Sequence, residues 1–324
     1  MEDLQKIKDI LLQSKKATII SHYNPDGDAI GSQIALGLGL KQLGIDVSLI
    51  NKDRAPNYYS FLADWESIKP LNEEDIYNTI VCVDCATMER TGYDAVELLR
   101  EGKRVLINID HHISNTNYAD YNWVDHNAAA TAELIYDLLG ILQVKIDKDM
   151  ANALYTGIST DTGSFLYENT TSTTHIVVSD LINRGADVNL LRLNYYENTS
   201  MSKIELVKHG LNNLSFAQDN KIAWITIGQQ TFLSAQATDA DAEGLINYVK
   251  GISGVEIAIT FREIEHEKIK VSFRSKSIAD VNELAAMFSG GGHPRASGCI
   301  FSGNMEDAVA KITSAAVKIL AQGG

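Results

Sequence analysis

Cysteine and proline are scarce in this chain of 324 residues, which holds three cysteines and four prolines. Three cysteines are too few for a small domain stabilised by disulfides. Few prolines, no low-complexity tract and 45% hydrophobic residues indicate an ordered globular protein rather than a disordered one. Cys82 and Cys85 lie in the apolar run TIVCVDC without a second pair to complete a zinc site, so we interpret them as core residues.

Basic residues and long apolar runs are also few. The chain has 28 Lys and Arg against 42 Asp and Glu, a net charge of −14. This charge argues against non-specific binding along long nucleic acids, which relies on many contacts from Lys and Arg to phosphates, but it allows a local cationic site. No apolar stretch of about 20 residues and no signal-peptide pattern are seen, so we expect a cytoplasmic protein.

The length predicts two domains. In the N-terminal half, short apolar runs at 17–22, 46–51, 79–84 and 104–110 alternate with helical patterns such as 2–14, 29–44 and 147–160. This alternation predicts an α/β domain with a doubly wound, mostly parallel sheet. We expect this domain to span 1–188, a linker to span 189–210, and a second domain to span 211–324.

The C-terminal third has a different pattern. It predicts a strand at 221–228, a helix at 241–252, two strands within 255–277 joined near 265–268, a helix at 279–288, a further strand and a last helix at 305–322. These elements indicate a smaller α+β domain. We expect the active site to lie in the cleft between the two domains.

Histidine and aspartate gather at the ends of the predicted strands. His22, Asp26 and Asp28 follow the first strand in HYNPDGD, Asp84 ends VCVD, and Asp110, His111 and His112 form the run DHH. The carboxyl ends of parallel strands line the crevice where α/β sheets bind ligands, so these groups should converge. Asp161, in STDTG, is a further candidate.

Imidazoles and carboxylates in this number form a ligand set that suits divalent ions such as Mn²⁺. Because the set exceeds the needs of one catalytic zinc, it predicts two metals that share a bridging carboxylate and a bridging hydroxide, which attacks phosphorus. Taken singly, each group has an ordinary alternative: a turn for NPDGD, a helix cap for Asp84, a core histidine in DHH, or a local loop contact for Asp161.

Several glycines also invite interpretation. Gly27 lies between two of these aspartates, and we expect it to allow a sharp reversal that directs Asp26 and Asp28 to different metals. The glycines of GLGLKQLG fall inside a predicted helix rather than at a strand-to-helix turn, so they indicate close helix packing and not a dinucleotide loop. Gly44 and Gly185 are expected to end helices.

The second domain carries a glycine run, SGGGHPRASG, in which the backbone can approach a phosphate closely. Ser272, Arg274 and Lys276 are spaced by two and would share one face of a regular strand. Arginine and lysine there could bind substrate phosphate. On its own, without the cluster of histidines and aspartates in the first domain, this region would better fit a flexible loop beside a salt-bridged edge strand.

Taken in order, HYNPDGDAIGS, VCVD, IDHH, STDTG and GGGHPRASG resemble the DHH phosphoesterase family with its DHH-associated C-terminal domain (DHHA1), specifically the nanoRNases that also act as 3′-phosphoadenosine 5′-phosphate (pAp) phosphatases. The resemblance implies one metal held by His22, Asp26 and Asp84, and a second held by Asp28, Asp84, His111 and Asp161. It also implies that His112 contacts the scissile phosphate and that Asp110 orients the histidines. The nucleotide would be held by Arg274, Gly291, Gly292, His293 and Arg295.

The resemblance further implies Mn²⁺, or else Mg²⁺ or Co²⁺, a homodimer, and hydrolysis of short oligoribonucleotides to mononucleotides and of pAp to AMP. Alternatives are a cyclic or linear dinucleotide phosphodiesterase (c-di-AMP or pApA), an exopolyphosphatase or pyrophosphatase, or a non-catalytic nucleotide-binding regulator. One departure is Ala130, where many relatives carry serine, which puts a hydroxyl contact in doubt.

Overall fold

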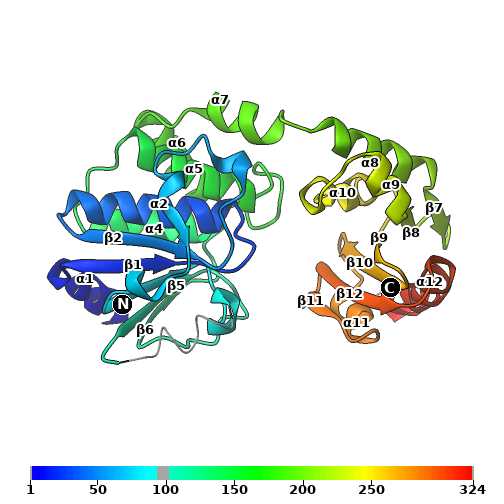
Figure 1. Cartoon of the computed structure of the whole chain (residues 1–324), viewed down its shortest axis with the longest axis horizontal. Helices are drawn as coiled ribbons and strands as arrows, with labels where there is room; N and C mark the ends of the chain where they lie inside the picture. The colour runs from blue at the N-terminus through cyan, green and yellow to red at the C-terminus, as the bar shows by residue number, and fades with distance from the viewer. Residues whose placement is uncertain (1, 93–101, 323–324) are drawn as a thin grey trace. The chain divides into compact units, whose positions relative to one another are not determined.

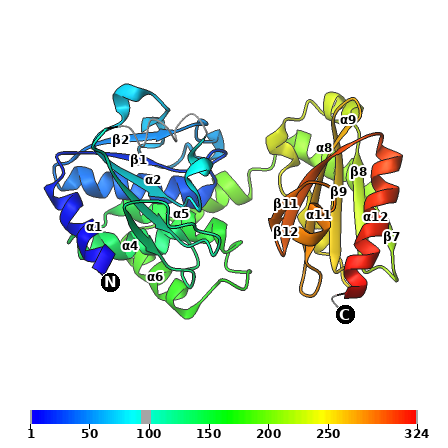
Figure 2. The same cartoon turned by 90° about the horizontal axis from the view of Figure 1, so that it is seen from below.

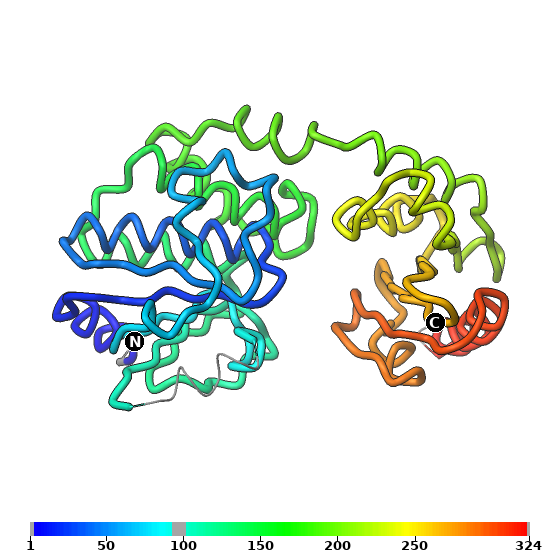
Figure 3. The backbone as a smooth tube through the Cα atoms, in the orientation of Figure 1, coloured from blue at the N-terminus to red at the C-terminus, as the bar shows by residue number. Residues whose placement is uncertain are grey.

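The computed structural model describes residues 2–92 and 102–322, which form two compact units, Met1–Asn198 and Thr199–Gly324 (Figures 1 and 3). Each unit has its own sheet. In the described ranges no helix is both long and apolar enough to cross a membrane.

The first unit is built on a six-stranded sheet with every neighbouring pair parallel, in the order β3-β2-β1-β4-β5-β6. The strands are β1 (Lys16–Ile20), β2 (Asp46–Asn51), β3 (Ile68–Pro70), β4 (Thr79–Val83), β5 (Val105–Asp110) and β6 (Tyr121–Val124). The predicted parallel α/β sheet is confirmed. The sequence patterns did not reveal β3 and β6, which are short and only partly buried.

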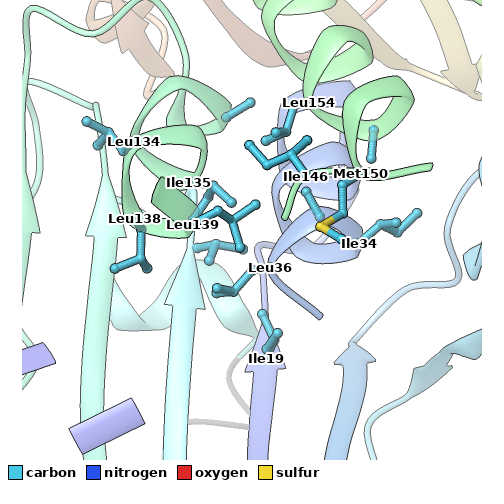
Figure 4. Packing of buried hydrophobic residues seen from close by; sticks show 14 of the residues in the cluster. Ile19, Ile34, Leu36, Leu134, Ile135, Leu138, Leu139, Ile146, Met150 and Leu154 are labelled. Carbon is cyan, nitrogen blue, oxygen red and sulfur yellow. The ribbon is translucent and has the colours of Figure 1, made fainter. Parts of the chain in front are cut away.

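Helices gather on one face of this sheet, with α1, α2 and α4 against the strands and α5, α6 and α7 against those helices or one another. They are α1 (Glu2–Gln13), α2 (Gly27–Gln42), α4 (Thr131–Ile141), α5 (Lys148–Asp161), α6 (Ser172–Asn183) and α7 (Val188–Leu191). Leu36 of α2, Leu139 of α4 and Leu154 of α5 meet in one core that also includes Ile19 of β1 (Figure 4). Over the described residues, Ile20, Ile50 and Cys82 on the opposite face pack against loops and 3-10 turns.

Close contacts between α2 and its neighbours depend on glycine. A Cβ at Gly39 would lie 2.2 Å from Cδ2 of Leu139, which confirms helix packing as the role of this glycine run. The expected helix ends are also confirmed, because α2 and α6 stop just before Gly44 (φ 82°) and Gly185 (φ 103°).

The interpretation of Gly27 as the point of a sharp reversal is wrong. Helix α2 begins at Gly27, two residues before the predicted start, with Asp26 as its N-cap. The reason for glycine is space: a Cβ would lie 2.2 Å from Oγ1 of Thr160 on α5. Asp26 caps the helix and Asp28 lies in its first turn, so the helix start itself separates the two carboxylates.

The second unit has a mixed sheet in the order β11-β12-β10-β9-β8-β7, which confirms the α+β prediction (Figure 2). The strands are β7 (Ser215–Ala217), β8 (Ile222–Ile227), β9 (Ile257–Glu265), β10 (Lys268–Ser275), β11 (Gly291–His293) and β12 (Ala296–Ser302). The helices are α8 (Met201–Asn212), α9 (Gln229–Ser234), α10 (Leu245–Lys250), α11 (Val281–Ala286) and α12 (Met305–Gln322). Helices α11 and α12 cover one face, and α8 and α10 pack on the other.

Two segments depart from simple expectations. The predicted helix 241–252 is a 3-10 turn, Asp239–Ala242, followed by α10. The segment 189–210, predicted as a linker, contains a π-helical turn, Arg192–Tyr196, and most of α8, whose Leu206 is buried against the second sheet.

Candidate metal centre

The predicted metal ligands of the first unit converge at the carboxyl ends of its strands. His22 lies two residues beyond β1, Asp84 directly follows β4, and Asp110 is the last residue of β5. The starts and ends of helices complete the group, since α2 carries Asp28 in its first turn and α5 ends at Asp161. Three overlapping groups of potential ligands result: His22, Asp26 and Asp84; Asp28, His111 and Asp161; and Asp84, His111 and His112.

His22 lies in the first of these groups. Its Nε2 atom lies 3.5 Å from Oδ2 of Asp84 and 3.8 Å from Oδ1 of Asp26. Its Nδ1 atom lies 2.9 Å from the carbonyl oxygen of Tyr23. A carbonyl can only accept, so Nδ1 carries the proton, and Nε2 is left to bind a cation.

His111 repeats this arrangement in the second group. Its Nδ1–H donates to the carbonyl oxygen of Ala128 at 3.2 Å. Its Nε2 atom lies 3.9, 3.7 and 3.6 Å from carboxylate oxygens of Asp28, Asp84 and Asp161. These separations exceed a hydrogen bond, and an ion among the oxygens and Nε2 would be surrounded by ligands of the kind that borderline divalent metals accept.

The electrostatics of the carboxylates also fit a cation. Burial, together with the charges of Asp84 and Asp161, raises the pKa of Asp28 well above its usual range. Burial, opposed by His111 and reinforced by Asp84, raises the pKa of Asp161 to about 7. Like charges enclosed together disfavour ionisation, and a bound cation removes that cost. The donor set therefore fits divalent metal ions.

The carboxylates also favour the positively charged form of a neighbouring histidine. Burial opposes protonation of His22, but the carboxylates of Asp26 and Asp84 outweigh it and raise the pKa of His22 to about 11. Burial acts against ionisation of Asp84 too, yet His22 and the two other histidines hold its pKa below its usual range. A metal ion beside these carboxylates would supply the positive charge that protonated histidines supply in its absence, so metal binding is expected to release protons.

Asp84 itself has an unusual backbone. Its φ angle is 55°, in the left-handed region that residues other than glycine, asparagine and aspartate rarely adopt. Its N–H donates to the carbonyl oxygen of Ile109 at 3.0 Å, which anchors it to the neighbouring strand. Strained positions of this kind cluster at functional sites, because the surrounding structure must hold them.

His112 differs from the other two histidines in its partner. Its Nδ1 atom lies 2.7 Å from Oδ1 of Asp110, which is completely buried. The other oxygen of Asp110 accepts from Nδ2 of Asn115 at 2.6 Å, and Asn115 also donates to Oδ1 of Asn108 at 2.7 Å. Hydrogen bonds to Asp110 outweigh burial and raise the pKa of His112 to about 9.

The sequence analysis did not identify Asn115, although this amide lies only five residues after the start of the DHH run.

The sequence analysis also did not identify the contact between the start of α4 and Asp28. The N–H groups of Thr131 and Ala132 donate to Oδ2 and Oδ1 of Asp28 at 2.6 and 2.9 Å. Ala130, where the family resemblance led us to expect serine, is a buried N-cap without a side-chain hydrogen bond, and the Thr131 hydroxyl donates to Asp84 nearby.

In the second unit, strand pairing brings most of the predicted nucleotide residues together. Arg274 of β10 pairs with Ala296 of β12, which pairs with His293 of β11. Gly291 pairs with Gly298, in register with Ser272, and Gly292 has a φ of 148°. Arg295, in the turn between β11 and β12, donates to the carbonyl oxygen of Ala279. Lys276 lies beyond the end of β10, so it is not part of the strand face that was predicted to hold Ser272, Arg274 and Lys276. On β10 itself, Lys270 and Ser272 share the face of Arg274.

A groove of about 930 Å³ adjoins these residues on the same unit and includes Ser272 and Gly290. Lys270 and the buried Arg262 also line it. Arg262 donates to Oδ1 of Asp239 at 2.9 Å and lies over the ring of Phe232. The groove is mixed in charge, since Asp239 and Glu263 line it together with Arg262 and Lys270, and it is partly apolar.

Comparison with known proteins agrees with this geometry. Residues 16–158 match the DHH family, N-terminal domain, and residues 225–321 match the DHHA1 domain. The chain is 31% identical over 310 residues to the bifunctional oligoribonuclease and PAP phosphatase NrnA of Thermus thermophilus, covering 94% of this chain and 90% of that protein. The protein of the same name from Bacillus subtilis is 31% identical over 294 residues, covering 89% and 90%.

A solved structure resembles both units. The crystal structure of an exopolyphosphatase-related protein from Bacteroides fragilis matches with a TM-score of 0.93 and 28% identity, covering 98% of this chain and 96% of that one.

Proposed function

The chain belongs to the DHH family of metal-dependent phosphoesterases and carries a DHHA1 domain, and from this premise we propose that it hydrolyses short oligoribonucleotides to mononucleotides and pAp to AMP. The relatives named oligoribonuclease and PAP phosphatase support the choice of substrates. The net charge of −14 agrees with short substrates, because a long strand would need a basic track.

The observation that carries the proposal is the position of Asp84 between two groups of ligands. Asp84 contributes one oxygen toward His22 and the other toward His111. We assign one ion, Mn²⁺ by preference, to His22, Asp26 and Asp84, and a second to Asp28, Asp84, His111 and Asp161. When bound, such a pair of ions activates a water molecule as the nucleophile and stabilises the charge on the phosphate oxygens.

Other residues of the chain are assigned to orienting His112 and to binding the nucleotide. Asp110 accepts a hydrogen bond from Nδ1–H of His112 and so fixes the orientation of the ring. This leaves Nε2 of His112 for the scissile phosphate. Asp110 is kept as an acceptor by Asn115, which occupies its second oxygen. We assign Arg274, Gly291, Gly292, His293 and Arg295 to nucleotide binding, and the homodimer and the cytoplasmic location expected from the sequence stay predictions.

A kinetic comparison tests the substrate assignment. One Mn²⁺-loaded sample of the full chain is assayed with pAp, a short RNA, a short DNA, c-di-AMP, pApA and pyrophosphate. Short RNA and pAp should have the highest kcat/KM. Preference for pyrophosphate by orders of magnitude would make the assignment wrong while leaving the metal site intact, and preference for c-di-AMP or pApA would favour the dinucleotide phosphodiesterase instead.

Substitution of Asp84 tests the centre itself. Asp84→Ala should abolish hydrolysis of every substrate, because both groups of ligands lose a member. Asp26→Asn and Asp28→Asn should each weaken a different metal position and leave the protein folded. Asp9→Asn is a matched control, since Asp9 is an exposed residue of α1 that accepts a hydrogen bond from Gln5. If Asp84→Ala were as active as Asp9→Asn, the proposed two-metal mechanism would be wrong.

A further inference from the structure

Thr131 contacts two of the carboxylates assigned to the metals. It is the first residue of α4 and is completely buried. Its hydroxyl donates to Oδ1 of Asp84 at 3.0 Å, and its N–H donates to Oδ2 of Asp28 at 2.6 Å. One residue thus joins Asp84, which follows β4, to Asp28, which lies in the first turn of α2.

The two oxygens of Asp84 face different groups of ligands. Oδ2 lies 3.5 Å from Nε2 of His22, whereas Oδ1 lies 3.7 Å from Nε2 of His111. A carboxylate turns readily about its Cβ–Cγ bond, because this torsion is broad and has two equivalent orientations. The hydrogen bond from Thr131 restricts this rotation and holds the plane of the carboxylate so that its two oxygens face different groups.

We propose that Thr131 is a positioning residue whose hydroxyl holds Asp84 in the orientation that lets it bridge two metal ions. This inference rests on the proposed function, because it requires that both groups of ligands bind metal ions. With the hydroxyl present, Oδ1 is directed toward His111 and Oδ2 toward His22. Without it, Asp84 is free to turn and place both oxygens on one ion, and the second ion loses a ligand.

The backbone N–H of Thr131 donates to Asp28, and substitutions of the Thr131 side chain retain this N–H group. Its N–H and that of Ala132 hold both oxygens of Asp28, and α4 starts at this point. Thr131→Val keeps these N–H groups and the branched shape of the side chain but removes the hydroxyl. Thr131→Ser keeps the hydroxyl and removes only a methyl group, so it is the matched control.

The test measures Mn²⁺ binding to the metal-free full chain, without any substrate. Calorimetric titration gives the stoichiometry and affinities, and electron paramagnetic resonance shows whether two Mn²⁺ ions are close enough to couple. The wild type and Thr131→Ser should bind two ions with a coupled spectrum. In Thr131→Val the weaker site should lose affinity by about 10- to 100-fold, the usual effect of removing a group that orients a ligand, and the coupled signal should disappear.

Each other outcome has a defined meaning. A coupled pair with unchanged affinity in Thr131→Val would overturn the inference about Thr131, and so would a Thr131→Ser variant that behaves like Thr131→Val. A wild type that binds fewer than two ions would instead contradict the proposed function. Thermal unfolding of the metal-free proteins checks folding, and if Thr131→Val does not fold, Thr131→Ala is compared with Thr131→Ser in the same way.

Discussion

Gly157 of α5 is the position where packing and the candidate metal centre are most directly linked. A Cβ at this residue would lie 2.8 Å from Cβ of Ala132 and 2.9 Å from Oδ1 of Asp28. Carbon atoms in contact normally lie about 3.5 to 4.0 Å apart, so Gly157→Ala must push α5 from Ala132 by roughly 1 Å and turn or displace the Asp28 carboxylate. Both changes disturb the hydrogen bonds that Asp28 accepts from the start of α4.

The expected size of the effect follows from two opposing contributions. Alanine is favoured over glycine inside a helix by about 1 kcal/mol, whereas overpacking a core costs about 1 to 3 kcal/mol. The difference predicts that Gly157→Ala lowers the free energy of unfolding by up to about 2 kcal/mol. Its phosphoesterase activity should fall about 100-fold, because a ligand displaced by about 1 Å affects the positioning of the reaction.

Gly140 of α4 provides the matched control. Within the described residues, a Cβ at Gly140 would meet no atom within 4 Å. Gly140→Ala should therefore raise stability by about 1 kcal/mol without a change in activity. Urea unfolding is followed by tryptophan fluorescence, since Trp65 and Trp123 lie in the first unit. If Gly157→Ala proved as stable and as active as Gly140→Ala, the reasoning about close packing at Asp28 would be refuted.

Three further predictions concern other parts of the chain. Burial opposes ionisation of Glu256, but hydrogen bonds from the N–H groups of residues 277–279 lower its pKa below the usual 4.5. This carboxylate therefore contributes stability that is present above pH 4.5 and lost as the pH falls through its lower folded-state pKa. Glu256→Gln should cost about 1 to 3 kcal/mol in urea unfolding at pH 7, and the cost should shrink as the pH is lowered from 4.5 through the folded-state pKa, whereas a cost that does not change with pH would contradict this account. Asn115→Ala leaves one oxygen of Asp110 unpaired and should reduce kcat more than it raises KM, whereas unchanged kcat would exclude a positioning role. Cys82 is completely buried, and burial raises its pKa to about 12, so a thiol reagent at pH 8 should modify it only after unfolding.

The positions of the candidate metal ligands were largely predictable from local patterns. His22, Asp84 and Asp110 follow or end apolar runs, and parallel strands carry their ends to one edge of a sheet wherever the order of strands is favourable. Asp161 required more, because it lies at the end of α5 rather than at a strand end, and its approach to His111 depends on how α5 packs on α2.

Residues that support the ligands were not predictable in the same way. Thr131 and Asp28 are 103 residues apart, and a threonine at a helix start has many ordinary explanations when it stands alone. The prediction for Gly27 was wrong for a related reason, since the demand for glycine comes from Thr160, which approaches from another helix. Neither contact leaves a periodic signal in the sequence.

Local patterns in the amino-acid sequence were enough to predict the α/β and α+β classes of the two units, the family, and the imidazoles and carboxylates of the candidate metal centre. These predictions depend on alternation, helical period and residue type, which are local properties of the chain. By contrast, the position of Asp84 between His22 and His111, the N–H groups that hold Asp28, and the places where glycine is required became visible only in the folded chain. Such features depend on distances of a few ångströms between segments far apart in sequence, and packing sets those distances.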